Sequence, residues 1–116
     1  MRLKIVYIDD EEALCEIFVD YFSNKDVEVI TFTDPVKAIA SCLSHPPDMI
    51  FVDYRLSGTT GDEVAKSIAA SIPKYLITGD INVKTEYKFS AAFNKPYKTD
   101  DIQRVLDGFL KIKSAA

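Results

Sequence analysis

The sequence predicts one α/β domain built on a parallel sheet with helices on both faces. Short apolar runs alternate five times with segments whose apolar residues recur at helical spacing, the order typical of a parallel sheet. The run at residues 49–52 is wholly apolar, as expected for a central strand buried on both faces. A length of 116 residues, 47% of them apolar, suits a single domain over residues 1–116.

Each element follows from a local pattern. The predicted strands are the apolar runs Leu3–Ile8, Val27–Phe32, 49–52, 75–78 and Ala91–Asn94. Apolar residues recur every three or four positions, which predicts helices, in four segments: 14–22, 36–43, 64–72 and 102–110. Asp34 caps the second helix, Pro35 suits its first turn, and Thr99 caps the last helix.

The segment between the fourth and fifth strands, residues 79–90, is the weak place in this pattern. A fourth helix belongs there, but the segment is short and mostly polar, with Val83, Tyr87 and Phe89 as the residues for a small apolar face. We expect a short or irregular helix rather than a full one.

Composition and charge exclude several classes of protein. The net charge of −4 argues against direct binding of nucleic acid, which needs a basic face. No apolar run approaches the length of a membrane span, and the first one is too short for a signal peptide. Cys15 and Cys42 lack a Cys-x-x-Cys spacing, which favours reduced packing residues. We therefore expect a cytoplasmic protein with no membrane partner.

Residues suited to phosphoryl chemistry follow four of the predicted strands. Asp9 and Asp10 follow the first, Asp53 the third, Thr78 ends the fourth, and Lys95 follows the fifth. The carboxyl ends of parallel strands meet at one crevice. Carboxylates suit Mg²⁺, and a lysine with a hydroxyl can hold phosphoryl oxygens. Each residue alone could be a cap, a strand residue or a loop residue, so the prediction depends on their joint placement.

These stretches resemble the receiver domains of two-component response regulators. The matching motifs are residues 5–11 with Asp9-Asp10-Glu11, residues 49–56 around Asp53, then Gly61, residues 76–79 with Thr78, and residues 94–97 with Lys95-Pro96. The resemblance covers essentially the whole chain. It implies a flavodoxin-like (βα)5 fold with strand order 2-1-3-4-5.

The resemblance also implies roles for these residues. Asp53 would accept a phosphoryl group from a phosphohistidine, with Thr78 and Lys95 holding the phosphoryl oxygens. The Mg²⁺ ligands would be Asp10, Asp53, the backbone carbonyl of Arg55, and Asp9, which binds through water or supports Asp10. The Lys95–Pro96 peptide bond is expected to be cis.

The implied function is a phosphorylation-switched module of a phosphorelay. Its partners would be a histidine kinase or a histidine phosphotransfer protein, and a downstream protein target or fused output domain. It would catalyse only its own phosphorylation and dephosphorylation, so it would not be an enzyme for an external substrate.

The chain departs from the family pattern at several positions. Ala92 stands where an aromatic residue usually responds to the threonine, and strand alternation points Phe93 the other way; Tyr87, Phe89 and Tyr97 are possible substitutes. Thr78 and Lys95 are 17 positions apart, fewer than the family has, and we expect the segment between them to become ordered on phosphorylation. Ser57 and Thr59-Thr60 replace the usual residues before Gly61, which predicts a looser loop.

The sequence leaves alternatives open for one pair of residues and for the function of the whole domain. Arg55 and Asp80 either form an ion pair over the phosphoryl group that slows attack by water, or stay independent and solvated. For the whole domain, the alternative function is a receiver-like scaffold that binds partners independently of phosphorylation. A phosphate-ester hydrolase is disfavoured because Arg55 stands where a second acid would be needed.

Overall fold

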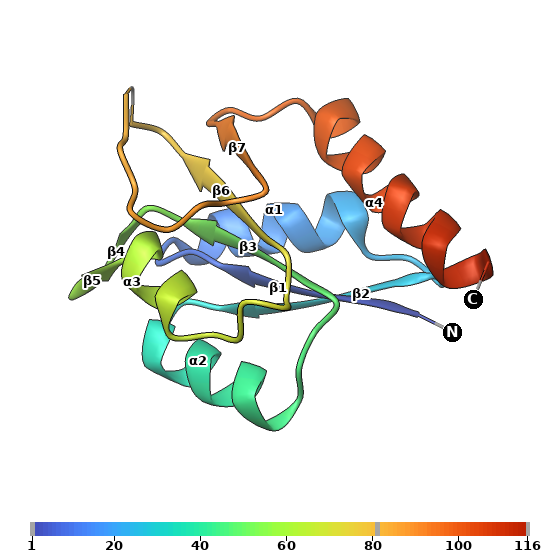
Figure 1. Cartoon of the computed structure of the whole chain (residues 1–116). Helices are drawn as coiled ribbons and strands as arrows, with labels where there is room; N and C mark the ends of the chain where they lie inside the picture. Colours follow the sequence, from blue (N-terminus) through green and yellow to red (C-terminus); the bar gives the residue numbers. More distant parts are fainter. Residues whose placement is uncertain (1, 81, 116) are drawn as a thin grey trace.

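The computed structural model describes residues 2–80 and 82–115 of the chain. Its main sheet contains β1 (Leu3–Ile8), β2 (Val27–Phe32), β3 (Met49–Asp53), β6 (Lys74–Thr78) and β7 (Ala91–Asn94). The strands lie in the order β2-β1-β3-β6-β7, and neighbouring strands are parallel (Figure 1). With β6 and β7 as the fourth and fifth strands, the predicted order 2-1-3-4-5 is confirmed.

Helices cover both faces of this sheet, as predicted. One face carries α1 (Glu12–Phe22) and α4 (Thr99–Ala115), and the other carries α2 (Pro35–Ser44) and α3 (Gly61–Lys66) (Figure 1). Two apolar clusters, one on each side of the sheet, make up the core. None of the helices in the described part of the chain is long and apolar enough to cross a bilayer.

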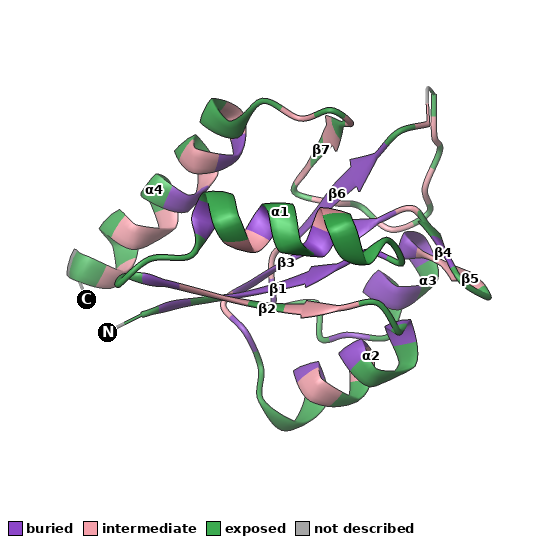
Figure 2. Ribbon diagram, turned by 180° about the vertical axis from the view of Figure 1, so that it is seen from behind, coloured by how far each residue is buried: buried purple, intermediate pink, exposed green. Residues whose placement is uncertain are grey.

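Alternation along the strands divides the core between the two faces. On β1, Tyr7 packs with the α1 and α4 side, whereas Val6 and Ile8 pack with the α2 and α3 side. Every residue of β3 is buried, which confirms that it is the central strand (Figure 2). Cys15 and Cys42 are buried free thiols that belong to these two clusters, one on each face.

The third helix is shorter than its apolar stripe predicts. It ends at Lys66, although Ile68 and Ile72 beyond it remain buried. The ammonium of Lys74 donates hydrogen bonds to the carbonyls of Ala69 and Ile72 at 2.7 and 3.0 Å. Those carbonyls therefore have a partner outside a helix, and the chain turns directly into β6.

The segment predicted to hold a short or irregular helix is irregular and, in its described residues, is not helical. Residues 82–90, here called the connecting segment, lead from the carboxyl edge of the sheet back to the start of β7. They form no helical hydrogen bonds. Side chains from elsewhere hold them instead. Asp62 accepts the backbone N–H groups of Glu86 and Tyr87 at 2.9 and 2.7 Å, and Lys74 donates to the Tyr87 hydroxyl at 2.9 Å.

The loop after β3 is more regular than predicted. It forms a small antiparallel hairpin from β4 (Arg55–Leu56) and β5 (Thr59–Thr60). Gly58 lies between them at φ 77°, a conformation that glycine adopts at no steric cost. The expectation of a looser loop is therefore wrong.

Candidate functional site

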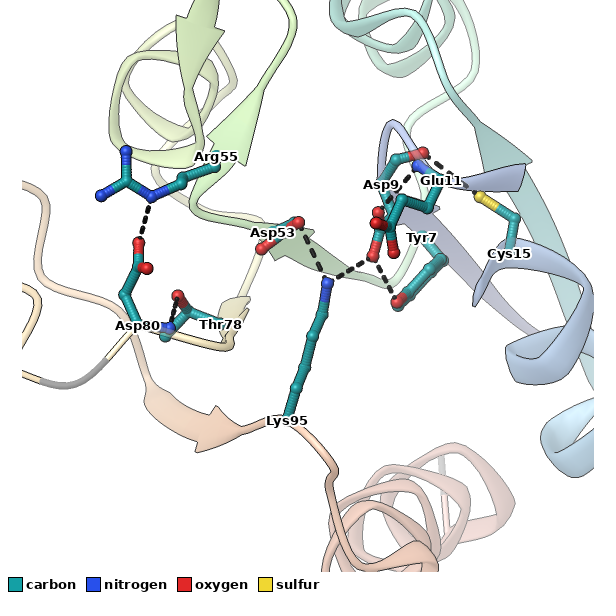
Figure 3. Close-up of polar contacts among 9 residues, drawn as sticks. All are labelled: Tyr7, Asp9, Glu11, Cys15, Asp53, Arg55, Thr78, Asp80 and Lys95. Carbon is teal, nitrogen blue, oxygen red and sulfur yellow. Dashed lines mark hydrogen bonds and ion pairs between the residues drawn. The ribbon is translucent and has the colours of Figure 1, made fainter. Parts of the chain in front are cut away.

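The carboxyl edge of the main sheet gathers the predicted site residues (Figure 3). Asp9 follows β1, Asp53 is the last residue of β3, Thr78 is the last of β6, and Lys95 follows β7. A pocket of about 340 Å³ opens there, with a lining of Asp10, Glu11, Asp53, Arg55, Thr78, Gly79, Asp80 and Lys95. The topology thus brings residues from four strands to one place.

Lys95 bridges two acids at the floor of the pocket. Its Nζ lies 2.8 Å from Asp9 Oδ2 and 3.0 Å from Asp53 Oδ2 (Figure 3). Burial lowers the pKa of Lys95, but the hydrogen bonds to the two carboxylates outweigh burial and leave that pKa raised. Burial raises the pKa of Asp53, which Lys95 only partly opposes. The Lys95–Pro96 peptide bond is cis, as predicted.

Asp9 is completely buried and accepts from three donors. Its Oδ1 accepts the backbone N–H of Glu11 at 3.0 Å, and its Oδ2 accepts from Lys95 and from the Tyr7 hydroxyl, the latter at 3.0 Å. Burial and the nearby Asp9 carboxylate raise the pKa of Tyr7, so its hydroxyl remains a donor. The sequence-based site lacked Tyr7, although its place two residues before Asp9 puts both side chains on one face of β1.

The three aspartates are close enough to share one cation. Asp9, Asp10 and Asp53 can each offer a carboxylate oxygen, and these oxygens lie within 4.8 Å of one another. Asp9 and Asp53 are buried, whereas Asp10 is exposed. Hard oxygen donors at this spacing fit Mg²⁺, which usually keeps several waters and takes only one or two carboxylates from a protein.

Arg55 and Asp80 form an ion pair at the mouth of the pocket, which is the first of the two alternatives considered for them. Arg55 Nε lies 2.6 Å from Asp80 Oδ2, and the Arg55 side chain is 76% exposed (Figure 3). The backbone N–H of Asp80 donates to Thr78 Oγ1 at 3.0 Å. The ion pair is therefore linked through Asp80 to the hydroxyl at the end of β6.

Gly61 keeps the backbone of Asp53 in place. Its N–H donates to the carbonyl of Tyr54 at 2.7 Å. A Cβ at this position would overlap the backbone carbonyl of Asp53. A side chain at position 61 would therefore displace the residue at the centre of the pocket.

Ala92 occupies the position that is usually aromatic in receiver domains, so no aromatic side chain is present there. Ala92 is exposed, and Phe93 points to the opposite face, where it packs 6.4 Å from Tyr75 between ring centroids. Tyr87 contacts Lys74, at the far end of β6 from Thr78. Tyr97 packs against Phe18 in the core. Neither tyrosine is placed where the usual aromatic residue responds to the threonine.

Fold and pocket together define a doubly wound α/β domain whose acidic pocket is closed by a lysine. The family model of the response regulator receiver domain matches residues 5–107. The chain therefore belongs to the response regulator receiver domain family.

Individual relatives agree with this assignment. The chain is similar to the alkaline phosphatase synthesis transcriptional regulatory protein PhoP of Bacillus subtilis (strain 168), with 31% identity over 68 residues, which are 59% of this chain and 28% of PhoP. Its fold is similar to the signal receiver domain of an HD domain-containing protein from Pseudomonas fluorescens Pf-5 (TM-score 0.86, 18% identity, 100% of both chains).

A third similarity is to NtrX from Brucella abortus, with a TM-score of 0.79 and 25% identity over 99% of this chain and 28% of that chain. The matched regions thus span less than a third of PhoP and of NtrX. What the comparison assigns to this chain is the receiver domain itself.

Proposed function

We propose that this domain accepts a phosphoryl group on Asp53 and that the new charge switches a binding surface. The observation that carries the proposal is the position of Lys95, whose ammonium lies 3.0 Å from Asp53 Oδ2 and 2.8 Å from Asp9 Oδ2. A cation is already present where the oxygens of a phosphoryl group on Asp53 would need one. Phosphoryl transfer depends mainly on such positioning and charge neutralisation.

Each residue of the pocket has its own part in the proposed phosphoryl transfer. A carboxylate oxygen of Asp53 forms a bond to phosphorus, while the bond from phosphorus to the donor's imidazole nitrogen breaks and the nitrogen keeps the electron pair. Lys95 turns to one phosphoryl oxygen. The Thr78 oxygen already accepts the Asp80 N–H, so its hydroxyl proton is available to donate to another phosphoryl oxygen.

Mg²⁺ is the proposed cofactor, held by Asp9, Asp10 and Asp53, whose oxygens lie within 4.8 Å of one another, with the Arg55 backbone carbonyl as a further ligand. When bound, the ion supplies positive charge between Asp53 and the phosphoryl oxygens. Exposed Asp10 can bind the ion at the mouth of the pocket. Buried Asp9 is held in place by the hydrogen bonds that it accepts from Tyr7, Glu11 and Lys95.

The proposed partners follow from the chemistry. The donor is a histidine kinase or a histidine phosphotransfer protein in the cytoplasm, and the recipient of the signal is a downstream protein or a fused output domain. The domain turns over only its own phosphoryl group, so it is not an enzyme for an external substrate. A phosphorylation-independent scaffold is not favoured, because the acids, hydroxyl and ammonium are assembled in one pocket.

The proposal is tested by intact mass after incubation with Mg²⁺ and a small phosphodonor such as acetyl phosphate. The wild-type protein is expected to gain one phosphoryl group, and Asp53→Asn none. EDTA should abolish the gain. No adduct on the folded wild-type protein would favour the scaffold instead.

A further inference from the structure

Tyr7 lies beneath the pocket, in a position fixed by the core. Its side chain is 1% exposed, and its ring stacks on Phe18 with the centroids 4.3 Å apart and the planes at 18°. From there its hydroxyl reaches up to Asp9 Oδ2 at 3.0 Å (Figure 3). Because the ring is buried and stacked on Phe18, the hydroxyl stays close to this oxygen.

The other side-chain donor to Asp9 Oδ2 is different in kind. Lys95 Nζ lies 2.8 Å from this oxygen and 3.0 Å from Asp53 Oδ2, at the end of a long, flexible side chain. Lys95 can therefore turn toward a group attached to Asp53. When it does, Tyr7 is the side chain that continues to donate to Asp9 Oδ2.

We propose that Tyr7 is a positioning residue for phosphorylation, because it holds the buried Asp9 carboxylate while Lys95 transfers to the phosphoryl oxygens. This inference rests on the proposed function of Asp53. A fully buried carboxylate that loses a donor without replacement is destabilised. Without the Tyr7 hydroxyl, Asp9 would retain Lys95, and the phosphorylated arrangement would form less readily.

The substitution Tyr7→Phe removes only the hydroxyl and keeps the ring on Phe18. Tyr97→Phe is a matched control, because Tyr97 packs against the same Phe18 with centroids 6.1 Å apart. The Tyr97 hydroxyl is buried and has no hydrogen-bond partner within the described residues. Both changes therefore delete one buried hydroxyl beside α1, but only one of them removes a donor to Asp9.

The experiment measures the affinity of each protein for beryllofluoride, a mimic of the phosphoryl group on aspartate, by NMR titration in Mg²⁺. Urea unfolding without the mimic shows that each variant is folded and gives its stability. We expect Tyr7→Phe to weaken beryllofluoride binding by at least about fivefold, and Tyr97→Phe to change it by less than about twofold.

A purely structural role for Tyr7 would lower stability yet leave the affinity within about twofold of wild type, and that result would overturn the inference. An equal loss of affinity in both variants would overturn it too, because the effect would not depend on Asp9. Wild-type protein that binds no beryllofluoride would overturn the proposed function together with the inference. Wild-type binding with an unaffected Tyr7→Phe would overturn the inference alone.

Discussion

The carboxylate of Asp62 accepts the backbone N–H of Tyr87 at 2.7 Å, across 25 positions of sequence. The same carboxylate accepts the N–H of Glu86 at 2.9 Å, and Asp62 is only 8% exposed. These bonds attach the connecting segment, where a short or irregular helix was expected, to α3. One buried acid thus satisfies backbone groups that a helix would otherwise satisfy within itself.

Asp62→Asn should loosen the connecting segment. The amide keeps the size of the side chain but offers a single acceptor oxygen, so one of the two backbone N–H groups faces an NH₂ group. We expect the free energy of unfolding in urea to fall by about 1–3 kcal/mol. Glu63→Gln, whose side chain is 63% exposed, is the control and should change little. Equal effects of the two variants would contradict the role given to Asp62.

Amide exchange separates loosening of this segment from a general loss of stability. In Asp62→Asn, exchange across residues 82–90 should accelerate more than exchange in β1 or β3. The same measurement on the wild-type protein, with and without Mg²⁺ and beryllofluoride, tests whether phosphorylation orders the segment. Unchanged protection on addition of the mimic would argue against that expectation.

Tyr87→Phe should destabilise the fold through Lys74. Lys74 is 1% exposed, and its ammonium has three acceptors: the carbonyls of Ala69 and Ile72 and the Tyr87 hydroxyl at 2.9 Å. Loss of one hydrogen bond to a buried charge should cost about 1.5–3 kcal/mol in urea unfolding. Tyr21→Phe, at an exposed tyrosine, is the control. Stability equal to that of the control would mean that the Lys74 bond contributes nothing measurable.

The difference in stability between Asp53→Asn and the wild-type protein should depend on pH in a defined direction. Burial raises the pKa of Asp53 above its ordinary value of 3.8, so the folded protein binds this proton more tightly than the unfolded chain does. The ionised carboxyl therefore destabilises the fold at pH values above the raised pKa, and this penalty disappears as the pH falls through it toward 3.8.

In EDTA, Asp53→Asn should accordingly be more stable than wild type near neutral pH. The advantage should shrink as the pH is lowered through the raised pKa. Urea unfolding of both proteins at a series of pH values measures it. An advantage that grows on acidification would contradict the raised pKa.

The ion pair between Arg55 and Asp80 should affect the lifetime of the phosphorylated state more than the stability of the fold. Arg55 is mostly exposed, so Arg55→Ala should change the free energy of unfolding by less than about 1 kcal/mol. Removal of the guanidinium opens the mouth of the pocket to water, and dephosphorylation should become severalfold faster. Arg104→Ala, which breaks an exposed pair on α4, should leave the lifetime unchanged. If Arg55→Ala does the same, the pair is ordinary surface charge.

The sheet could be predicted because its strands are short, largely apolar runs that alternate with helical patterns. The pocket could be predicted because parallel topology alone brings the ends of β1, β3, β6 and β7 together. β6 nevertheless begins one residue earlier than predicted, at Lys74. A lysine argues against a buried strand unless its ammonium finds partners, and the sequence does not reveal the carbonyls of Ala69 and Ile72.

The missing helix and the role of Tyr7 could not be predicted for related reasons. Both depend on side-chain contacts between elements far apart in sequence, as between Asp62 and Tyr87. The apolar spacing at residues 64–72 indicates which residues are buried, but it does not show that all of them are helical. Ile68 and Ile72 are buried, although they lie beyond the end of α3. An aromatic residue such as Tyr7 in an apolar run indicates a core position. The hydrogen bond from its hydroxyl to Asp9 becomes apparent only in the structure.

Asp53, and not a neighbouring acid, is the residue proposed to receive the phosphoryl group. Asp9 and Asp10 each offer an oxygen in the same cluster, so the position of the adduct must be measured. Borohydride reduces an aspartyl phosphate to homoserine, which peptide mapping by mass spectrometry can locate. After phosphorylation in Mg²⁺, we predict homoserine at position 53 alone. Homoserine at position 9 or 10, or at no position in protein that carries the adduct, would show that Asp53 is not the phosphoacceptor.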